Sequence, residues 1–253
     1  MTVANAMGEH ADGVAVEQKQ WQFNAAMERY QDKPVYRWFE RAVSVVNLSL
    51  QACLVALALA TPIAALRQLA AFLLAFVLAD FVGGLVHMIA DSNDHYRGFI
   101  GPLVAAFHLH HKKPVYTRSN LFVVYFHESG SKVWLAVLLL LVVLAHALVD
   151  LPRFALHIVA YFAVLSSVAE VSHYLCHVPH RRIFDLLARA GVLLSPRHHG
   201  RHHHRDNQSY AFLNGMTDPI LDRIASVFFA GYKTTTDLHY ARYTGKDTAN
   251  RAA

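Results

Sequence analysis

Long uncharged stretches dominate the pattern of hydrophobic and polar positions along the chain. Four of them are Ala42–Leu66 (25 residues), Gln68–Ala90 (23 residues, with Asp80 inside it), Val133–Val149 (17 residues) and a run from Phe154 past Glu170 to about Cys176. A helix needs about 20 apolar residues to cross the hydrocarbon core of a bilayer. The pattern therefore predicts an all-α integral membrane protein with four transmembrane helices. A soluble protein with buried helices is the weaker alternative, because runs this long are difficult to bury in 253 residues.

The segments outside these runs show weaker patterns. Residues 1–15 are expected to be disordered, whereas residues 16–40 have the amphipathic pattern of one or two surface helices. Arg181–Leu194 is expected to lie along the membrane interface as a helix, and Asp218–Phe229 is expected to form another helix. The predicted organisation is a cytoplasmic N-terminal segment (1–40), a membrane-embedded domain (41–230) with a histidine-rich helical cap, and a C-terminal tail (231–253).

Composition and charge support the membrane interpretation and give it an orientation. Hydrophobic residues make up 55% of the chain and charged residues 16%, against a usual share of about 25%. Lys and Arg number 5 before the first run, then 1, 5 and 1 in the three loops, and 11 after the last run. By the positive-inside rule, both termini and the loop 91–132 are cytoplasmic, at a bacterial inner membrane or the endoplasmic reticulum. The basic residues lack interleaved aromatic residues, so no nucleic-acid partner is expected.

The 18 histidines are concentrated in four places that this topology brings to the cytoplasmic face. Imidazole is the commonest nitrogen ligand for transition metals, and two side chains at i, i+3 or i, i+4 on a helix can bind one ion together. The candidate ligands are His87 in the second run, His110 and His111 in the loop, His173 and His177 at the end of the fourth run, and His198, His199, His202 and His203 in an interior run. Nine nitrogens suit two metal ions with four or five ligands each.

Acidic residues accompany these histidines within the apolar runs. Asp80, Gly84, His87 and Asp91 follow one another at spacings of 4, 3 and 4, so they form one stripe on a helix. Glu170 shares a helical face with the histidines three and seven residues after it. Ionisable residues inside a membrane are costly and are by default functional. We therefore expect Asp80, Asp91 and Glu170 to orient liganding imidazoles from behind.

Four segments together resemble the motifs of a known family. They are DFVGGLVHMIAD, FHLHHKKP, EVSHYLCH and Leu193–Ile224. Over about residues 77–226 the chain resembles the lipid desaturase family that includes plasmanylethanolamine desaturase (the CarF or Kua group), among the histidine-rich membrane di-iron desaturases. The family's D-x-x-x-G-x-x-H falls on Asp80, Gly84 and His87, its HH-x-x-P on His110, His111 and Pro114, its H-x-x-x-H on His173 and His177, and its HH-x-x-HH on His198, His199, His202 and His203.

The chain departs from the family pattern in two places. Family members place a further histidine in the sequence R-H-D-F, whereas Arg118 here is followed by Ser119 and Asn120. Either Asn120 substitutes for that histidine or the histidine is not required. The family's N-G-W-x-N-P reads NGMTDP at residues 214–219, which leaves the exact substrate open.

The resemblance implies an enzyme with two iron ions that uses O2 and two electrons to introduce a C=C bond into a membrane lipid chain. It favours conversion of a 1-O-alkyl ether phospholipid (plasmanylethanolamine) to a vinyl ether (plasmalogen), with a phospholipid acyl chain as the other substrate. No haem-binding, flavin or G-x-G-x-x-G motif occurs in the sequence. A separate electron donor of the cytochrome b5 or ferredoxin type is therefore expected.

Two alternatives belong to other reaction or function classes. A di-iron lipid or fatty acid hydroxylase uses a similar site, because hydroxylation and desaturation diverge only after the first hydrogen is removed. A metal transporter is a weaker alternative. It would need polar residues along several spans to pass an ion, and the first and third apolar runs contain few.

Overall fold

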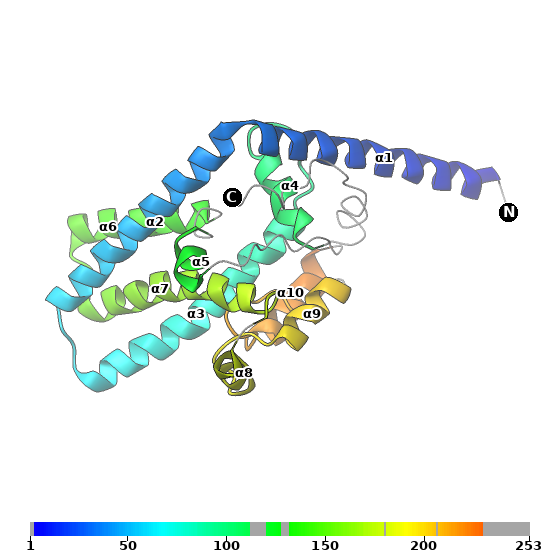
Figure 1. Ribbon diagram of the computed structural model, residues 1–253. Helices are drawn as coiled ribbons and strands as arrows, with labels where there is room; N and C mark the ends of the chain where they lie inside the picture. The colour runs from blue at the N-terminus through cyan, green and yellow to red at the C-terminus, as the bar shows by residue number, and fades with distance from the viewer. Residues whose placement is uncertain (1–2, 112–119, 128–131, 180, 206, 230–253) are drawn as a thin grey trace.

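The computed structural model describes residues 3–111, 120–127, 132–179, 181–205 and 207–229, with side chains from residue 16 onward. Within these ranges the chain is helical and contains no strand, which confirms the predicted all-α class (Figure 1). The helices are α1 (Val3–Asp32), α2 (Pro34–Ala60), α3 (Ala65–Asp91), α4 (Gly101–Leu109), α5 (Leu121–His127), α6 (Val133–Val149), α7 (Arg153–Leu175), α8 (Arg182–Arg189), α9 (Pro196–His204) and α10 (Asp218–Phe228).

Three of the described helices are long and apolar enough to cross a membrane. They are α2, α3 and α7, with 27, 27 and 23 residues. The prediction of a membrane-embedded chain is confirmed by these three helices. The helix α6 is equally apolar but has only 17 residues, so a fourth span stays a prediction.

The first apolar run does not continue as one helix to its predicted end. α2 ends at Ala60 and α3 begins at Ala65, whereas the predicted first span ends at Leu66. The turn between the two helices contains Pro62, which has no backbone N–H with which to continue a helix. The predicted end is therefore wrong, because an uncharged sequence can pass through a turn without interruption.

Small side chains bring α3 and α7 together, and the two helices lie side by side in Figure 1. Ala71, Ala75 and Ala79 recur every four residues on one face of α3 and are 0%, 0% and 2% exposed. Ala160 and Ala163 of α7 belong to the same buried core cluster as Ala75 and Ala79. Where lipid surrounds helices, small residues at the contact let the backbones approach closely. The α3–α7 pair is therefore the frame on which the remaining elements are placed.

Buried polar contacts attach the other helices to this frame. The Asn47 side chain of α2 donates a hydrogen bond to the Lys132 carbonyl oxygen at the start of α6, at 3.1 Å. Gln51 Nε2 donates to Ser167 Oγ of α7 at 2.8 Å, and the Tyr125 hydroxyl of α5 donates to Gln51 Oε1 at 2.7 Å. These bonds satisfy polar groups that water does not reach inside an apolar bundle.

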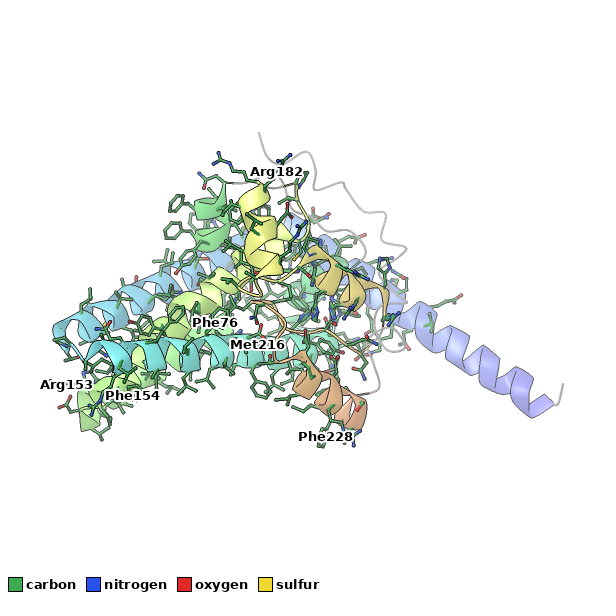
Figure 2. All side chains as sticks on the ribbon, turned by 90° about the horizontal axis from the view of Figure 1, so that it is seen from below. Phe76, Arg153, Phe154, Arg182, Met216 and Phe228 are labelled. Carbon is green, nitrogen blue, oxygen red and sulfur yellow. The ribbon has the colours of Figure 1, made fainter. Side chains whose placement is uncertain are left out.

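The short helices α4, α8, α9 and α10 form a cap at the end of the bundle where α3 and α7 finish (Figure 1). Among them, α8 ends at Arg189, five residues before its predicted end, and is followed by Gly191 with a φ of 72°. Glycine tolerates this left-handed conformation and commonly ends a helix. Arg182 of α8 and Phe228 of α10 both point outward, as Figure 2 shows, and Phe228 is 75% exposed. The interfacial position of α8 stays a prediction.

The N-terminal segment is a helix rather than a disordered stretch. Residues 1–15 were expected to be disordered, but α1 begins at Val3. The expectation is therefore wrong from Val3 onward. Phe23 packs edge-on against Tyr96 with ring centroids 5.3 Å apart, and Lys19 Nζ lies 2.9 Å from Asp94 Oδ2. The predicted C-terminal tail, residues 231–253, lies outside the described residues.

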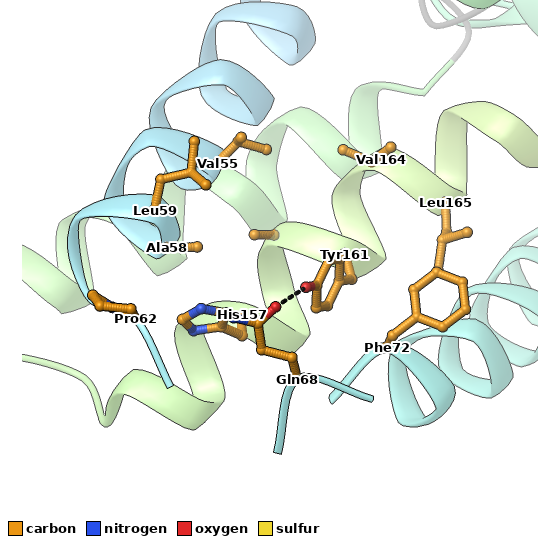
Figure 3. A pocket seen from close by; sticks show the side chains of 11 residues that line it. Val55, Ala58, Leu59, Pro62, Gln68, Phe72, His157, Tyr161, Val164 and Leu165 are labelled. Carbon is orange, nitrogen blue, oxygen red and sulfur yellow. Dashed lines mark hydrogen bonds between the residues drawn. The ribbon is translucent and has the colours of Figure 1, made fainter. Parts of the chain in front are cut away.

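A cavity of about 300 Å³ lies between α2, α3 and α7 (Figure 3). It is near the α2–α3 turn and hence at the opposite end of the bundle from the cap. Its walls are mostly aliphatic, and its polar groups are Gln68, His157 and Tyr161. His157 Nδ1 lies 2.9 Å from the Arg153 carbonyl oxygen, a contact in which the imidazole donates. The His157 imidazole therefore makes its hydrogen bond within α7 and takes no part in the site in the cap.

We expect Ala75→Leu to destabilise the fold by about 1–3 kcal/mol, because three extra heavy atoms must fit between α3 and α7. The midpoint of thermal unfolding of the purified protein in detergent measures this. Ala70→Leu is the matched control, since Ala70 lies on the exposed side of the same helix. Equal midpoints for the two variants would contradict the assignment of the α3–α7 contact.

Candidate metal centre

Four segments that lie far apart in the sequence bring potential metal ligands to the capped end of the bundle. The contributing side chains are His87 and Asp91 from α3, His110 and His111 from the end of α4, His173 and His177 from the end of α7, and His199, His202 and His203 from α9. They form two groups, and within each group the ligand atoms all lie within 4.8 Å of one another. The structure thus brings together eight of the nine predicted histidines.

Local sequence explains why the histidine-rich run forms the helix α9. Ser195 precedes the helix, and its Oγ accepts a hydrogen bond from the His198 backbone N–H at 3.1 Å. Pro196 occupies the first helical position, where its missing N–H costs nothing. The helix start fixes the direction in which each following histidine points.

The first group, the five-histidine cluster, consists of His110, His173, His177, His199 and His203. Their Nε2 atoms converge. The His110 Nε2 atom lies 3.0 Å from that of His173 and 3.1 Å from that of His177. The His199 Nε2 atom lies 2.9 Å from those of both His177 and His203. Each ring therefore directs the same nitrogen at a common centre.

The second group, the Asp91 cluster, consists of His87, Asp91, His111 and His202, all of them buried. The Asp91 carboxylate lies at its centre. The Nε2 atoms of His87, His111 and His202 are 3.3, 3.1 and 3.4 Å from the nearer Asp91 oxygen. Asp91 was expected to orient an imidazole from behind, whereas the structure places its oxygens among the potential ligands.

The two histidine doublets connect these clusters. His110 and His203 belong to the five-histidine cluster, while their chain neighbours His111 and His202 belong to the Asp91 cluster. Successive residues on a helix point about 100° apart, so a doublet places one ring in each of two adjoining sites. The ring centroids of His111 and His203 are 5.5 Å apart, which shows how close the two clusters lie.

Backbone carbonyl groups set the protonation of several rings. The Nδ1 atoms of His87, His202 and His203 lie 2.7, 3.0 and 3.2 Å from the carbonyl oxygens of Tyr210, Gln208 and His111. A carbonyl oxygen only accepts, so each Nδ1 carries the proton. The Nε2 lone pair of each ring is consequently left to face its cluster, as in metal sites whose histidines are oriented by a second partner.

Burial keeps the rings outside the spans uncharged. Burial lowers the pKa of His177 to about 2 and that of His203 to about 4, and repulsion from neighbouring histidines contributes to both shifts. For His202, burial lowers the pKa to about 3 although the Asp91 carboxylate raises it. These imidazoles are neutral at pH 7. Two neutral rings can share one proton between their Nε2 atoms, but five converging nitrogens cannot all be satisfied in this way.

A cation satisfies all the converging lone pairs at once, so the residues present fit a metal centre. One site offers five imidazole nitrogens, and the other offers three imidazole nitrogens and a carboxylate. Imidazole suits zinc, copper, iron and nickel, and the addition of a carboxylate is compatible with iron. The clusters could therefore hold two adjacent metal ions.

Glu170 faces the ring of His173 in the five-histidine cluster. It also forms an ion pair with Lys132, which was not predicted from the sequence. Glu170 Oε2 lies 3.9 Å from His173 Nδ1, so the carboxylate is on the side of the ring away from the converging nitrogens. Lys132 Nζ lies 3.0 Å from Glu170 Oε1 and also donates to the Ser166 carbonyl oxygen. The sequence signal for Lys132 was its position as the charged residue directly before an apolar run.

Asp80 does not orient a histidine, contrary to expectation. It is fully buried, and Oδ1 accepts hydrogen bonds from the backbone N–H groups of Asn214 and Gly215, at 2.9 and 3.1 Å. Its Oδ2 accepts from the backbone N–H and the hydroxyl of Thr217, at 3.0 and 2.7 Å. Asp80 therefore holds the segment 210–218, which we call the strap, against α3.

Gly84 is the remaining member of the stripe that Asp80, Gly84, His87 and Asp91 form on α3. A Cβ atom at Gly84 would lie 3.1 Å from the Ala211 Cα atom and would clash with Leu221 Cδ1. Glycine thus allows the strap to approach the helix closely. One turn later, His87 binds the strap through the Tyr210 carbonyl oxygen. The stripe at spacings of 4, 3 and 4 is a row of contacts that ends at the Asp91 cluster.

Besides Asp80 and Glu170, two more of the predicted site residues lie outside both clusters. His198 Nε2 lies 2.5 Å from Asp218 Oδ2, so this ring binds the start of α10 instead of joining the other histidines of α9. Asn120 is exposed, and its Oδ1 accepts hydrogen bonds from the backbone N–H groups of Phe122 and Val123. It begins the helix α5 and does not occupy the position of a ligand. Pro114 lies outside the described residues.

Comparison with known proteins agrees with the motifs. Residues 76–232, more than half of the chain, match the protein family described as a lipid desaturase domain. This range contains every member of both clusters. No curated protein and no solved structure matches the chain. The resemblance to the family is confirmed, while a place in its CarF or Kua group stays a prediction.

We expect His199→Ala to lower the metal content of the purified protein from two ions per chain to about one, because it removes a ligand from one cluster only. Inductively coupled plasma mass spectrometry measures the metal content. His204→Ala is the control, since His204 is exposed, lies on the same helix and belongs to neither cluster. An unchanged metal content in His199→Ala would contradict the five-histidine cluster.

His198→Ala should retain both metal ions yet destabilise the fold by about 1–3 kcal/mol, because the buried Asp218 carboxylate loses a hydrogen-bond partner. The metal content and the midpoint of thermal unfolding are measured on the same preparation. Loss of metal equal to that in His199→Ala, without a lower midpoint, would show that His198 is a ligand after all.

Proposed function

The chain belongs to the lipid desaturase family, and we propose that it is a membrane lipid desaturase in which the two clusters hold a pair of iron ions. The observation that carries this proposal is the pairing of a five-histidine cluster with an adjoining cluster of three histidines and Asp91. One closed structural metal site would need about four ligands, whereas this arrangement offers nine. Two adjacent ions suit a reaction that moves electrons in pairs.

The proposed reaction removes one hydrogen from each of two neighbouring carbons of a lipid chain. Its balance is R–CH2–CH2–R′ + O2 + 2 e− + 2 H+ giving R–CH=CH–R′ + 2 H2O. Iron held by neutral imidazoles supplies, when bound, the redox chemistry that activates O2 for attack on an unactivated C–H bond, which side-chain acids and bases cannot perform.

The protein's own contribution is to hold the two iron ions, to orient the imidazoles that bind them and to enclose the site. His110, His173, His177, His199 and His203 would bind one iron ion, and His87, Asp91, His111 and His202 the other. The carbonyl groups of Tyr210, Gln208 and His111 keep the proton of three rings on Nδ1. Glu170, neutralised by Lys132, stands behind His173. These fixed positions limit the rearrangement needed during turnover.

The location of the clusters supports a lipid as substrate. His87 and His173 lie near the ends of two apolar helices that are long enough to span a membrane, which supports a site between the cap and the bilayer. A lipid chain can enter from the bilayer, while electrons arrive from the opposite side. By the distribution of Lys and Arg, we propose that the cap and both termini are cytoplasmic, at a bacterial inner membrane or the endoplasmic reticulum.

The resemblance of the motifs supports a specific substrate, a 1-O-alkyl ether phospholipid (plasmanylethanolamine) that becomes a vinyl ether (plasmalogen). A phospholipid acyl chain is the second substrate that the family chemistry accommodates. The electrons would come from a separate carrier of the cytochrome b5 or ferredoxin type, because the sequence contains no flavin or haem motif of its own.

The proposal is tested in cells that express the chain and receive a labelled ether phospholipid. We expect a new vinyl ether in lipid extracts, dependent on O2, and its loss by at least about 100-fold on His202→Ala, since removal of a ligand disables the centre. His204→Ala should retain the product. Incorporation of labelled oxygen from O2 into the lipid would instead identify a hydroxylase. Absence of any new double bond or hydroxyl group would refute the proposal.

A further inference from the structure

Phe212 occupies a position between the two clusters. Its ring stacks on the ring of His173, with centroids 4.4 Å apart and an interplanar angle of 16°. The same ring lies 4.2 Å from that of His87. His173 belongs to the five-histidine cluster and His87 to the Asp91 cluster. One side chain thus contacts an imidazole of each candidate metal site.

The other surroundings of Phe212 are those of the apolar bundle. Phe212 and its neighbour Leu213 belong to the same core cluster as Ala79 of α3 and Ala169 of α7. Phe212 is only 8% exposed. The ring therefore stands at the boundary between the imidazoles and the apolar interior formed by helices long enough to span the membrane. This is the side of the clusters that faces the apolar bundle.

The strap holds Phe212 in place from both directions. On one side of it, the Ala211 backbone N–H donates to Asp218 Oδ1 at 2.8 Å. On the other side, Ser172 Oγ of α7 donates to the Leu213 carbonyl oxygen at 2.7 Å. Asp80 binds the next part of the strap from α3. The backbone that carries Phe212 is thus fixed to both helices of the frame, and it cannot move aside without breaking these bonds.

We propose that Phe212 is a specificity-determining residue, whose ring forms the surface against which the lipid chain packs beside both clusters. This inference rests on the proposed function and deepens it. Desaturation requires that two neighbouring carbons stay near the centre until the second hydrogen has left. A rigid apolar ring that contacts an imidazole from each cluster restricts the chain in this way, and it excludes water from the same space. Phe212 therefore sets which carbons react and favours desaturation over hydroxylation.

The first test measures contact with lipid and does not depend on catalysis. Phe212→Trp and Phe107→Trp, each in the full-length protein, are reconstituted into vesicles of phosphatidylethanolamine and phosphatidylglycerol with brominated acyl chains. Bromine quenches tryptophan fluorescence on contact, and the unsubstituted protein supplies the baseline from Trp21, Trp38 and Trp134. Phe107 is the matched control, because it also contacts His87, with centroids 5.5 Å apart, but does so from α4 in the cap.

We expect bromination to quench the emission added by Phe212→Trp and to leave that added by Phe107→Trp unchanged. Equal quenching, or quenching of Phe107→Trp alone, would overturn the proposal. The comparison of brominated with unbrominated vesicles cancels any quenching by a bound metal.

The second test follows the products of Phe212→Leu in cells. A smaller, non-planar side chain lets the substrate chain shift, and a displacement of about 1 Å can change a rate up to about 100-fold. We expect the ratio of hydroxylated to desaturated product to rise roughly tenfold, with double bonds at additional positions. Phe122→Leu is the control, since Phe122 is 74% exposed on α5. An unchanged product ratio and bond position in Phe212→Leu would contradict the proposal.

The two tests separate this inference from the proposed function. If the unsubstituted protein forms no oxidised lipid but Phe212→Trp is quenched selectively, the contact with lipid stands and the desaturase reaction does not. If the unsubstituted protein forms the product and Phe212 shows neither effect, the reaction stands and the role of Phe212 does not. A thermal midpoint for each variant shows that it is folded. Where the unsubstituted protein forms the product, a negative result from either folded variant overturns the role of Phe212.

Discussion

Eight imidazole rings direct lone pairs into two small volumes, one of them enclosed by buried residues alone, and the rest of the cap follows from the need to hold the rings there. In the five-histidine cluster, Nε2 atoms approach one another to between 2.9 and 3.3 Å. Uncharged nitrogens at such distances repel unless a proton or a cation lies between them. Because burial also opposes protonation, the chain must supply a rigid scaffold in which a cation is the natural partner.

Rigidity comes from several elements that have no ligand role. Ser195 sets the start of α9, backbone carbonyl groups fix three ring orientations, and the strap closes the site toward the bundle. Asp80 and Gly84 hold the strap against α3 at the two turns that precede His87. A single helical face thus combines attachment, close approach and metal binding. Phe212, the proposed substrate surface, lies on the same strap, so a shift of the strap would move both His87's hydrogen-bond partner and that surface.

The sequence predicted the helical class, the apolar helices and most of the cluster members. It succeeded because each of these depends on local spacing: about 20 apolar residues for a span, and i, i+3 or i, i+4 for two rings on one helix. It failed at the α2–α3 turn, since counting charges gave no weight to Pro62. The doublets at residues 110–111 and 202–203 do contribute to both clusters, in line with the expectation of two ions.

The remaining differences come from long-range contacts that spacing does not reveal. His198 has the same helical spacing as its neighbours, but its ring forms a hydrogen bond with Asp218, which lies 20 residues further along the chain. Asp91 joins a cluster because His111 and His202 arrive from other segments. The partnership of Lys132 with Glu170 and the position of Phe212 likewise depend on how α6, α7 and the strap pack. Sequence alone could identify the residue types, whereas tertiary packing assigned their roles.

Mössbauer spectroscopy of full-length protein purified with isotopically enriched iron tests the central claim most directly. Two iron ions per chain, one among five imidazoles and the other among three imidazoles and a carboxylate, predict two distinct quadrupole doublets of equal area. A single iron per chain, or a spectrum of iron bound outside both clusters and unaffected by replacement of His199 and His202, would contradict the account.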